Sequence, residues 1–133
     1  MRIFGPEIVE KLTDIFSEEE TRDEEDGHEI EQGYKPAIKP LPVNLADYDT
    51  IIIGTPVWWY TYAPAVAAFL SEYNLSGKTI IPFATNGGWI GHTFKDIKKA
   101  CDGADVKMEM NIRFNGAVLS TPEKEIQTWI HGI

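Results

Sequence analysis

Residues 48–60 decide the fold; they read YDTIIIGTPVWWY. The three consecutive isoleucines, Ile51, Ile52 and Ile53, favour a strand that is covered on both faces, as the strands of a parallel sheet are. Gly54 and Pro56 follow, and both residue types weaken or interrupt the hydrogen-bond ladder of a sheet. The pattern therefore predicts a short buried strand over residues 50–53, with a loop after it.

Aromatic residues crowd the loop that is predicted to follow this strand. Within five positions the chain places Trp58, Trp59, Tyr60 and Tyr62. In open α/β sheets, ligands bind at the carboxyl ends of the strands, so this loop indicates a site for a flat aromatic ligand. The competing interpretation is that Trp58 and Trp59 fill the core or a dimer interface. Side chains alternate along an extended chain, so only one of the two faces any given surface.

Helical and strand patterns alternate through the rest of the chain. We expect a helix from Pro64 with Val66, Phe69, Leu70 and Tyr73 on its apolar face, and then a buried strand over residues 79–84. A helix opened at Thr93 by a capping box with Asp96, a strand over residues 105–114 and a helix capped by Thr121 should follow. Such alternation is typical of an α/β domain with a parallel sheet and helices on both faces. The 133 residues suit a single domain, residues 1–133.

The charge of this chain is concentrated in one segment. Residues 17–31 hold nine acids and one base, whereas the remainder holds twelve acids and eleven bases. Such a block is usually solvated and mobile, or it steers a basic redox partner. Nucleic-acid binding is disfavoured because the chain has no basic patch. No apolar run approaches the about 20 residues of a membrane span, and the lone Cys101 fits a buried helix position in a cytoplasmic protein.

Two loops at the same edge of the predicted sheet carry the candidate chemistry. Aromatic faces come from the first loop, residues 54–64, and glycines that let a ligand approach the backbone come from the second, residues 85–93. Together they suit a planar heterocycle with polar edges. His92, which stands before the predicted helix cap, is expected to be a structural polar residue or a donor to such a ligand. No spacing predicts a metal site, a phosphate-binding P-loop or a catalytic triad.

Four segments of the chain resemble the flavodoxin family. They read GYKPAIKPLP, YDTIIIGTPVWW, NLSGKTIIPFATNGGWIG and STPEKEIQTWI. The resemblance implies a three-layer, flavodoxin-like open parallel sheet that binds FMN and passes electrons to a redox partner protein or a small acceptor. It also implies that residues 55–60 flank the flavin ring on one side and that residues 85–89 hydrogen-bond its polar edge through backbone groups, with no protein side chain needed as a catalytic group. The implied FMN-binding residues are Thr55, Pro56, Val57, Trp58, Trp59, Tyr60, Thr85, Asn86, Gly87, Gly88 and Trp89.

The N-terminal region departs from that family. The family opens with a strand and a loop rich in hydroxyl residues that holds the FMN phosphate at a helix N-terminus. Here the nearest candidate is Phe4-Gly5-Pro6-Glu7, which has no hydroxyl and carries an acid. We therefore expect the first strand to be missing or reduced, with residues 7–16 helical or residues 13–16 a strand. A truncated form or a cofactor-free binding or assembly module is the alternative, and an unpaired sheet edge predicts a homodimer.

Overall fold

The structure, a computed structural model, describes residues 36–133. Several predictions lie outside that part of the chain: the helix or strand before residue 17, the acidic segment 17–31 and the Phe4–Glu7 loop. None of the helices within residues 36–133 is long and apolar enough to cross a membrane.

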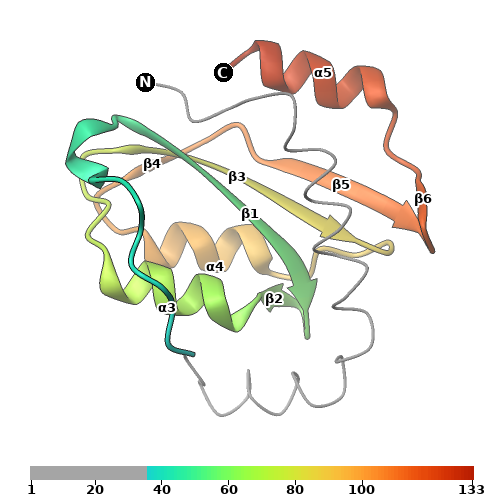
Figure 1. Cartoon of the computed structure of the whole chain (residues 1–133). Coiled ribbons are helices and arrows are strands. Elements are labelled where there is room, and N and C mark those ends of the chain that lie inside the picture. The colour runs from blue at the N-terminus through green and yellow to red at the C-terminus, as the bar shows by residue number, and fades with distance from the viewer. Residues whose placement is uncertain (1–35) are drawn as a thin grey trace.

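A largely parallel sheet forms the middle layer (Figure 1). Its order is β2-β1-β3-β5-β6, with β4 also beside β3. The parallel strands are β1 (Thr50–Trp58), β3 (Thr79–Asn86), β4 (Asp105–Val106) and β5 (Met110–Asn115). Two short strands pair antiparallel, β2 (Thr61–Tyr62) with β1 and β6 (Val118–Leu119) with β5.

Helices cover both faces of this sheet, as the sequence predicts. Figure 1 shows α3 (Pro64–Glu72) and α4 (Thr93–Ala100) on one face and α5 (Glu123–His131) on the other. A short 3₁₀ turn, Leu45–Asp47, precedes β1. The three-layer arrangement follows from the apolar residues of the central strands, which need cover on both sides.

The two faces of the sheet bury separate clusters. On the first face the buried residues are Ile51, Ile53, Leu75, Ile80, Ile97 and Cys101, packed by the predicted apolar positions of α3. On the second they are Phe83, Ile112 and Ile126, with Trp129 and Ile130 of α5 against them. Ile52 belongs to the second side and is only half-buried. The α5 face therefore covers β1 less completely than the α3 and α4 face does.

The prediction that Gly54 and Pro56 end the first strand is wrong, because β1 continues to Trp58. Gly54 lies under the ring of Phe83, and a Cβ at that position would stand 2.1 Å from Phe83 Cζ. Glycine is therefore required at position 54 because a side chain would clash with Phe83, and the backbone there remains extended as part of β1. Pro56 pairs in register with Thr85 on one side only, and a strand edge tolerates the missing N–H.

The predicted strand over residues 105–114 is interrupted. Ile80 of β3 pairs with Val106, and Phe83 pairs with Met110. The three residues 107–109 therefore lie opposite only two residues of β3, 81 and 82. This bulge lies opposite Pro82, which has no N–H for a ladder bond. Met108 in the bulge has a φ of 56°. Its carbonyl accepts a hydrogen bond from Trp129 Nε1 at 2.6 Å, which replaces the lost pairing.

Two predicted helix caps are also corrected. The N-cap of α4 is His92, and Thr93 Oγ1 instead donates to the Ile90 carbonyl at 2.7 Å. The N-cap of α5 is Pro122, and Thr121 Oγ1 instead accepts the Arg113 N–H at 2.7 Å. Both hydroxyls lie in the protein interior, so they satisfy neighbouring backbone groups rather than the ends of the helices.

Candidate functional site

Two loops meet at the carboxyl ends of β1 and β3. The first is the tight turn at Trp59-Tyr60 between β1 and β2, and the second runs between β3 and α4. The rings of Tyr60 and Trp89 have centroids 4.8 Å apart and are tilted by 51°. The Tyr60 carbonyl accepts a hydrogen bond from the His92 N–H at 2.8 Å. The two predicted loops are therefore in direct contact, through both rings and backbone.

The turn at Trp59-Tyr60 has an unusual backbone. Its φ angles are 48° and 72°, the left-handed combination that a two-residue hairpin turn needs and that Asn-Gly normally supplies. A bulky residue in that conformation costs about 1–2 kcal/mol. Gly91 lets the neighbouring loop approach, because a Cβ there would stand 2.3 Å from the Tyr60 carbonyl oxygen. Strain of this kind concentrates at ligand sites, so its position here is informative.

Three aromatic side chains stand exposed around this contact. The exposed fractions are 44% for Trp59, 50% for Tyr60 and 66% for Trp89. Among residues 36–133, only Val43 and Val118 are other large apolar side chains with comparable exposure. An exposed group of large aromatics indicates a binding surface, whereas single exposed apolar residues need no explanation. The exposed rings of Tyr60 and Trp89, which touch each other, thus form a candidate surface for a planar ligand.

Thr55 and Thr85, two of the predicted site residues, have buried side chains. Thr55 is 0% exposed; its Oγ1 accepts the Ala63 N–H at 3.0 Å and donates to the Pro56 carbonyl at 2.8 Å. This hydroxyl holds the start of α3 against β1 and so supports the loop from below. Thr85 is likewise buried in β3, while Pro56, Val57 and Trp58 are half-buried in β1.

Asn86 shapes the second loop. Its Oδ1 accepts the Gly88 N–H at 3.0 Å, and its Nδ2 donates to Asn111 Oδ1. Gly87 and Gly88 are exposed, and Gly88 has a φ of 147° that side chains rarely adopt. The N–H of Gly88 is therefore already engaged within the turn. What the glycine pair offers a ligand is mainly open space beside the backbone.

A polar network that the sequence analysis missed ties the turn to α4. Thr61 Oγ1 donates to Asp96 Oδ2 at 2.6 Å, and the same carboxylate oxygen pairs with His92 Nδ1. Burial raises the pKa of the nearby Tyr62 phenol, and the charges of Asp96 and Cys101 raise it further. The signal in the sequence was the spacing of His92 and Asp96, four residues apart at a helix start. The network fixes the imidazole of His92 at the rim of the site.

The helix starts at this end offer little to an anion. In α3 the first residue is Pro64, which has no N–H, and the Ala63 N–H is taken by Thr55. The first turn of α4 contains Asp96, and that of α5 contains Glu123 and Glu125. Acids at these positions repel a phosphate that the helix dipole would otherwise attract. Within residues 36–133, the edge thus fits an aromatic ring and lacks a phosphate cradle.

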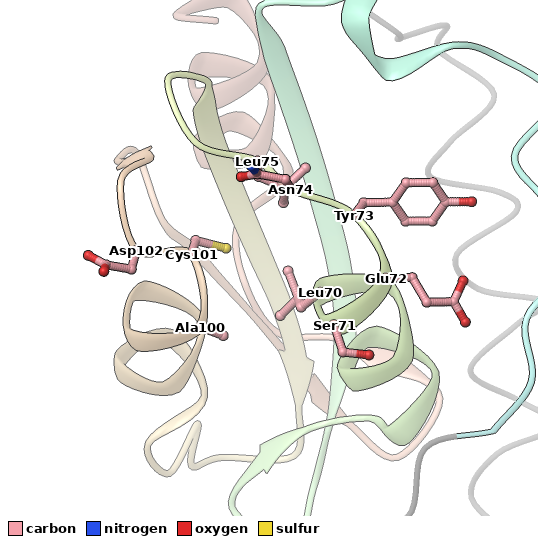
Figure 2. A pocket seen from close by; sticks show the side chains of 9 residues that line it. All are labelled: Leu70, Ser71, Glu72, Tyr73, Asn74, Leu75, Ala100, Cys101 and Asp102. Carbon is pink, nitrogen blue, oxygen red and sulfur yellow. The ribbon is translucent and has the colours of Figure 1, made fainter.

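A separate open pocket of about 320 Å³ lies at the opposite end of the sheet, between the last residues of α3 and α4. Figure 2 shows that the carboxylates of Glu72 and Asp102 point outward from it. Cys101 lines it with a buried thiol whose pKa is raised by that burial. In the described part of the chain, no group of three or more His, Cys, Asp or Glu residues is placed to hold a metal ion.

Comparison with known proteins bears on this site. The family model described as Flavodoxin matches residues 16–133. A solved structure from Bacteroides eggerthii DSM 20697 aligns with a TM-score of 0.65 and 32% identity, over 84% of this chain and 68% of that one. Another, from Bacteroides uniformis ATCC 8492, aligns with a TM-score of 0.67 and 26% identity, over 83% and 68%. Both are described as a "putative flavoprotein". No curated protein matches the chain.

Proposed function

The chain belongs to the flavodoxin family, and from this premise we propose that it binds FMN at the carboxyl edge of the sheet and transfers electrons. The electrons would go to a partner protein or to a small organic acceptor. When bound, FMN supplies the one- and two-electron chemistry, and the protein supplies binding, orientation and electrostatics. We place this activity in the cytoplasm, which suits a chain whose single cysteine is free and buried.

The observation that carries the proposal is the exposed aromatic group formed by Trp59, Tyr60 and Trp89. Tyr60 and Trp89 come from different loops and touch each other, so they present one continuous wall. A planar ring against that wall would gain burial plus about 0.5–1.5 kcal/mol for each favourable aromatic contact. The strained turn at Trp59-Tyr60 holds the wall in place before any ligand arrives, which lowers the ordering cost of binding.

The other residues of the edge would position and shield the ring. Asn86 fixes the turn that carries the exposed glycine pair, and the missing side chains there leave room for the polar edge of the ring. Thr61 and Asp96 hold β2 against α4. His92 stands at the rim with Nδ1 bound to Asp96, which orients its ring. Each of these roles is a matter of placement, and none requires a side chain to react.

The phosphate end of FMN finds no counterpart in residues 36–133, because the helix starts carry proline or acids. The ring loops would therefore supply most of the affinity that this part of the chain provides. In the sequence before residue 36, the nearest candidate loop, Phe4–Glu7, has no hydroxyl and carries an acid, so riboflavin, which lacks the phosphate, should bind within about tenfold of FMN. A working phosphate cradle with several charge-assisted bonds of about 1.5–3 kcal/mol each would separate the two ligands far more widely.

The experiment is a titration of the purified full chain with FMN and with riboflavin, followed by tryptophan fluorescence and by flavin absorbance between about 300 and 550 nm. Trp89→Ala should weaken both ligands by about tenfold or more, whereas Trp89→Phe retains a flat ring and most of the affinity. Val118→Ala is the matched control, since Val118 is equally exposed but lies on β6. If neither flavin binds, or if Trp89→Ala binds as the unaltered chain does, this site assignment fails.

Electron transfer needs its own readout. A flavin-loaded protein that is reduced by dithionite and then reoxidised by a quinone or by a one-electron acceptor protein would support the redox role. The reoxidation rate should exceed that of free flavin at the same concentration. Bound flavin that does not exchange electrons faster than free flavin would leave binding intact and remove the proposed redox activity.

A second candidate is a cofactor-free binding or assembly module on the same fold. The missing phosphate cradle in residues 36–133 favours it, because the helix starts at this edge would repel a phosphate. In that case the aromatic wall would bind another flat or apolar partner. A colourless protein that ignores both flavins, yet folds and keeps Trp89 exposed to fluorescence quenchers, would favour this module over the electron-transfer protein.

A further inference from the structure

Within the described part of the chain, the outer edge of β1 is unpaired over most of its length. On the inner side, β1 pairs with β3 from Thr50 to Pro56. On the outer side, β2 covers only Val57 and Trp58. Among residues 36–133, no strand lies beside the outer edge from Thr50 to Pro56. A row of open N–H and C=O groups on such an edge is a template for another strand.

The hydrogen-bond pattern shows which groups face outward. The Asp49 carbonyl accepts the Thr79 N–H at 2.9 Å, so Asp49 faces β3. Because the backbone groups of successive strand residues point to alternate sides, Thr50, Ile52 and Gly54 direct both N–H and C=O outward. The same alternation points Trp58 outward, where it is paired with Thr61 of β2. The assignment is therefore consistent at both ends of the strand.

This outward row is bounded on each side. Pro56 also faces outward, but it has no N–H to donate. At the other end, the Tyr48 N–H is bonded to the Leu45 carbonyl at 3.1 Å, and the Tyr48 carbonyl accepts from Lys78 Nζ at 2.7 Å. Thr50, Ile52 and Gly54 thus have no strand beside them on this side among residues 36–133, and Ile52 lies in the middle of the three.

We propose that this edge pairs with the same edge of a second copy of the chain, antiparallel, with Ile52 opposite the partner copy's Ile52. Thr50 then lies opposite Gly54 of the other copy, and the arrangement repeats by symmetry. Each hydrogen-bonded pair exchanges two bonds, so the three pairs contribute about six. Shifting the register by two residues would bring Pro56 or Tyr48 into the ladder and lose donors. Antiparallel pairing also closes on a two-fold axis, whereas parallel pairing would not.

Charge and shape on this edge favour a second copy. Residues 50–71 contain no charged side chain, so the edge lacks the charged residues that usually prevent strand pairing. Residues 36–133 hold eight bases and nine acids, and most of the formal net charge of −9 lies in residues 1–35, so little charge repulsion arises from the residues around this edge. Ile52 is half-buried and Gly54 is exposed on the α5 face, so pairing would also cover apolar surface. This inference does not depend on flavin binding.

The test uses cysteine cross-linking in the full chain. In a hydrogen-bonded antiparallel pair the opposed Cα atoms are about 5.5 Å apart, which lies within the disulfide range of about 4.4–6.8 Å. Ile52→Cys should therefore form a reducible dimer under mild oxidation. Thr50→Cys is the matched control, because its partner in this register is Gly54. Native Cys101 is buried, and the unaltered chain should not cross-link.

Light scattering and sedimentation of the unaltered chain should show a concentration-dependent dimer. Thr50→Lys adds a charged group at the open edge and should weaken that dimer by about tenfold or more while the protein stays folded by circular dichroism. Equal cross-linking of Thr50→Cys and Ile52→Cys would overturn the register. A monomer at all concentrations would overturn the dimer. Slow hydrogen exchange at Thr50, Ile52 and Gly54 in such a monomer would assign the edge to a strand from residues 1–35 of the same chain.

Discussion

At the carboxyl ends of β1 and β3, the exposed end, three large aromatic side chains reach solvent, whereas near the amino end of β3, the sealed end, smaller apolar side chains are buried. Trp59, Tyr60 and Trp89 stand 44–66% exposed on a strained turn and a glycine loop. At the other end, Leu75 and Cys101 are 5% exposed between α3 and α4. The pocket beside them has carboxylates that point outward (Figure 2).

The difference separates what the fold needs from what a ligand needs. Apolar side chains at the sealed end contribute to stability through burial. Aromatic side chains at the exposed end contribute little to burial, yet backbone strain and a three-residue polar network hold them in place. Backbone strain that is not offset by burial of side chains is expected at ligand-binding sites. Stability and ligand affinity should therefore respond to substitutions at different ends of the sheet.

The largest effect is expected from Leu75→Ala at the sealed end. Leu75 belongs to the buried cluster with Ile80 and Ile97, and truncation of such a leucine costs about 2–5 kcal/mol of unfolding free energy. Urea unfolding would measure that loss. Flavin affinity of the folded fraction should stay within about twofold of the unaltered chain. A large loss of flavin affinity in this variant would contradict the inference that stability and ligand binding depend on different ends of the sheet.

An intermediate effect is expected from Tyr60→Gly at the exposed end. Glycine relieves the left-handed strain at a φ of 72°, a gain of about 1–2 kcal/mol, and loses the Trp89 contact of about 0.5–1.5 kcal/mol. Stability should then remain within about 1 kcal/mol, while flavin affinity falls by about tenfold. Tyr60→Phe keeps the ring and serves as the control in the same titration. A marked loss of stability in Tyr60→Gly would show that the ring belongs to the core.

The smallest effect is expected from alkaline titration of the two ends. The pKa values of Cys101 and Tyr62 are raised, from ordinary values of 9.0 and 10.0, first of all by burial. The folded state therefore keeps these protons longer than the unfolded chain. Their stabilising contribution is complete below pH 9 and 10 respectively, and it declines as the pH rises through the folded values.

Urea unfolding over that alkaline range measures the decline. Cys101→Ala should reduce the decline in unfolding free energy that begins above pH 9. Tyr62→Phe should reduce the decline that begins above pH 10. A thiol reagent such as Ellman's reagent should react slowly with the folded unaltered chain, because the Cys101 thiol is buried. Rapid reaction of Cys101 with the reagent at pH 8 would show that this thiol is accessible and would contradict its burial at the sealed end.

Sequence patterns predicted the layered α/β fold, because the apolar periods that produce it are local. The isoleucines of β1 and the apolar face of α3 each lie within ten residues of chain, and both take the predicted places. The family resemblance is likewise shown by the match over residues 16–133. Tyr60 and Trp89 could be assigned to one edge because parallel strands end on the same side of a sheet.

The hydrogen-bond partners of the threonine hydroxyls could not be predicted from local sequence patterns. Thr93 and Thr121 stand where caps usually stand, but their oxygens serve Ile90 and Arg113 instead. Thr55 is in a predicted ligand loop, but it bonds Ala63 inside the protein. In each case the partner is available only after the chain has folded, and a buried donor or acceptor without a partner is costly.

The sequence by itself determined the alternation of strands and helices, the apolar centre of the sheet and the aromatic loops, since these depend on the spacing of residues along one segment. The tertiary structure alone decided that β1 runs on through Gly54 under Phe83, that the chain bulges opposite Pro82, and that His92, Asp96 and Thr61 share one network. It also left Thr50, Ile52 and Gly54 facing outward. These features depend on contacts between residues distant in the chain, which no local period encodes.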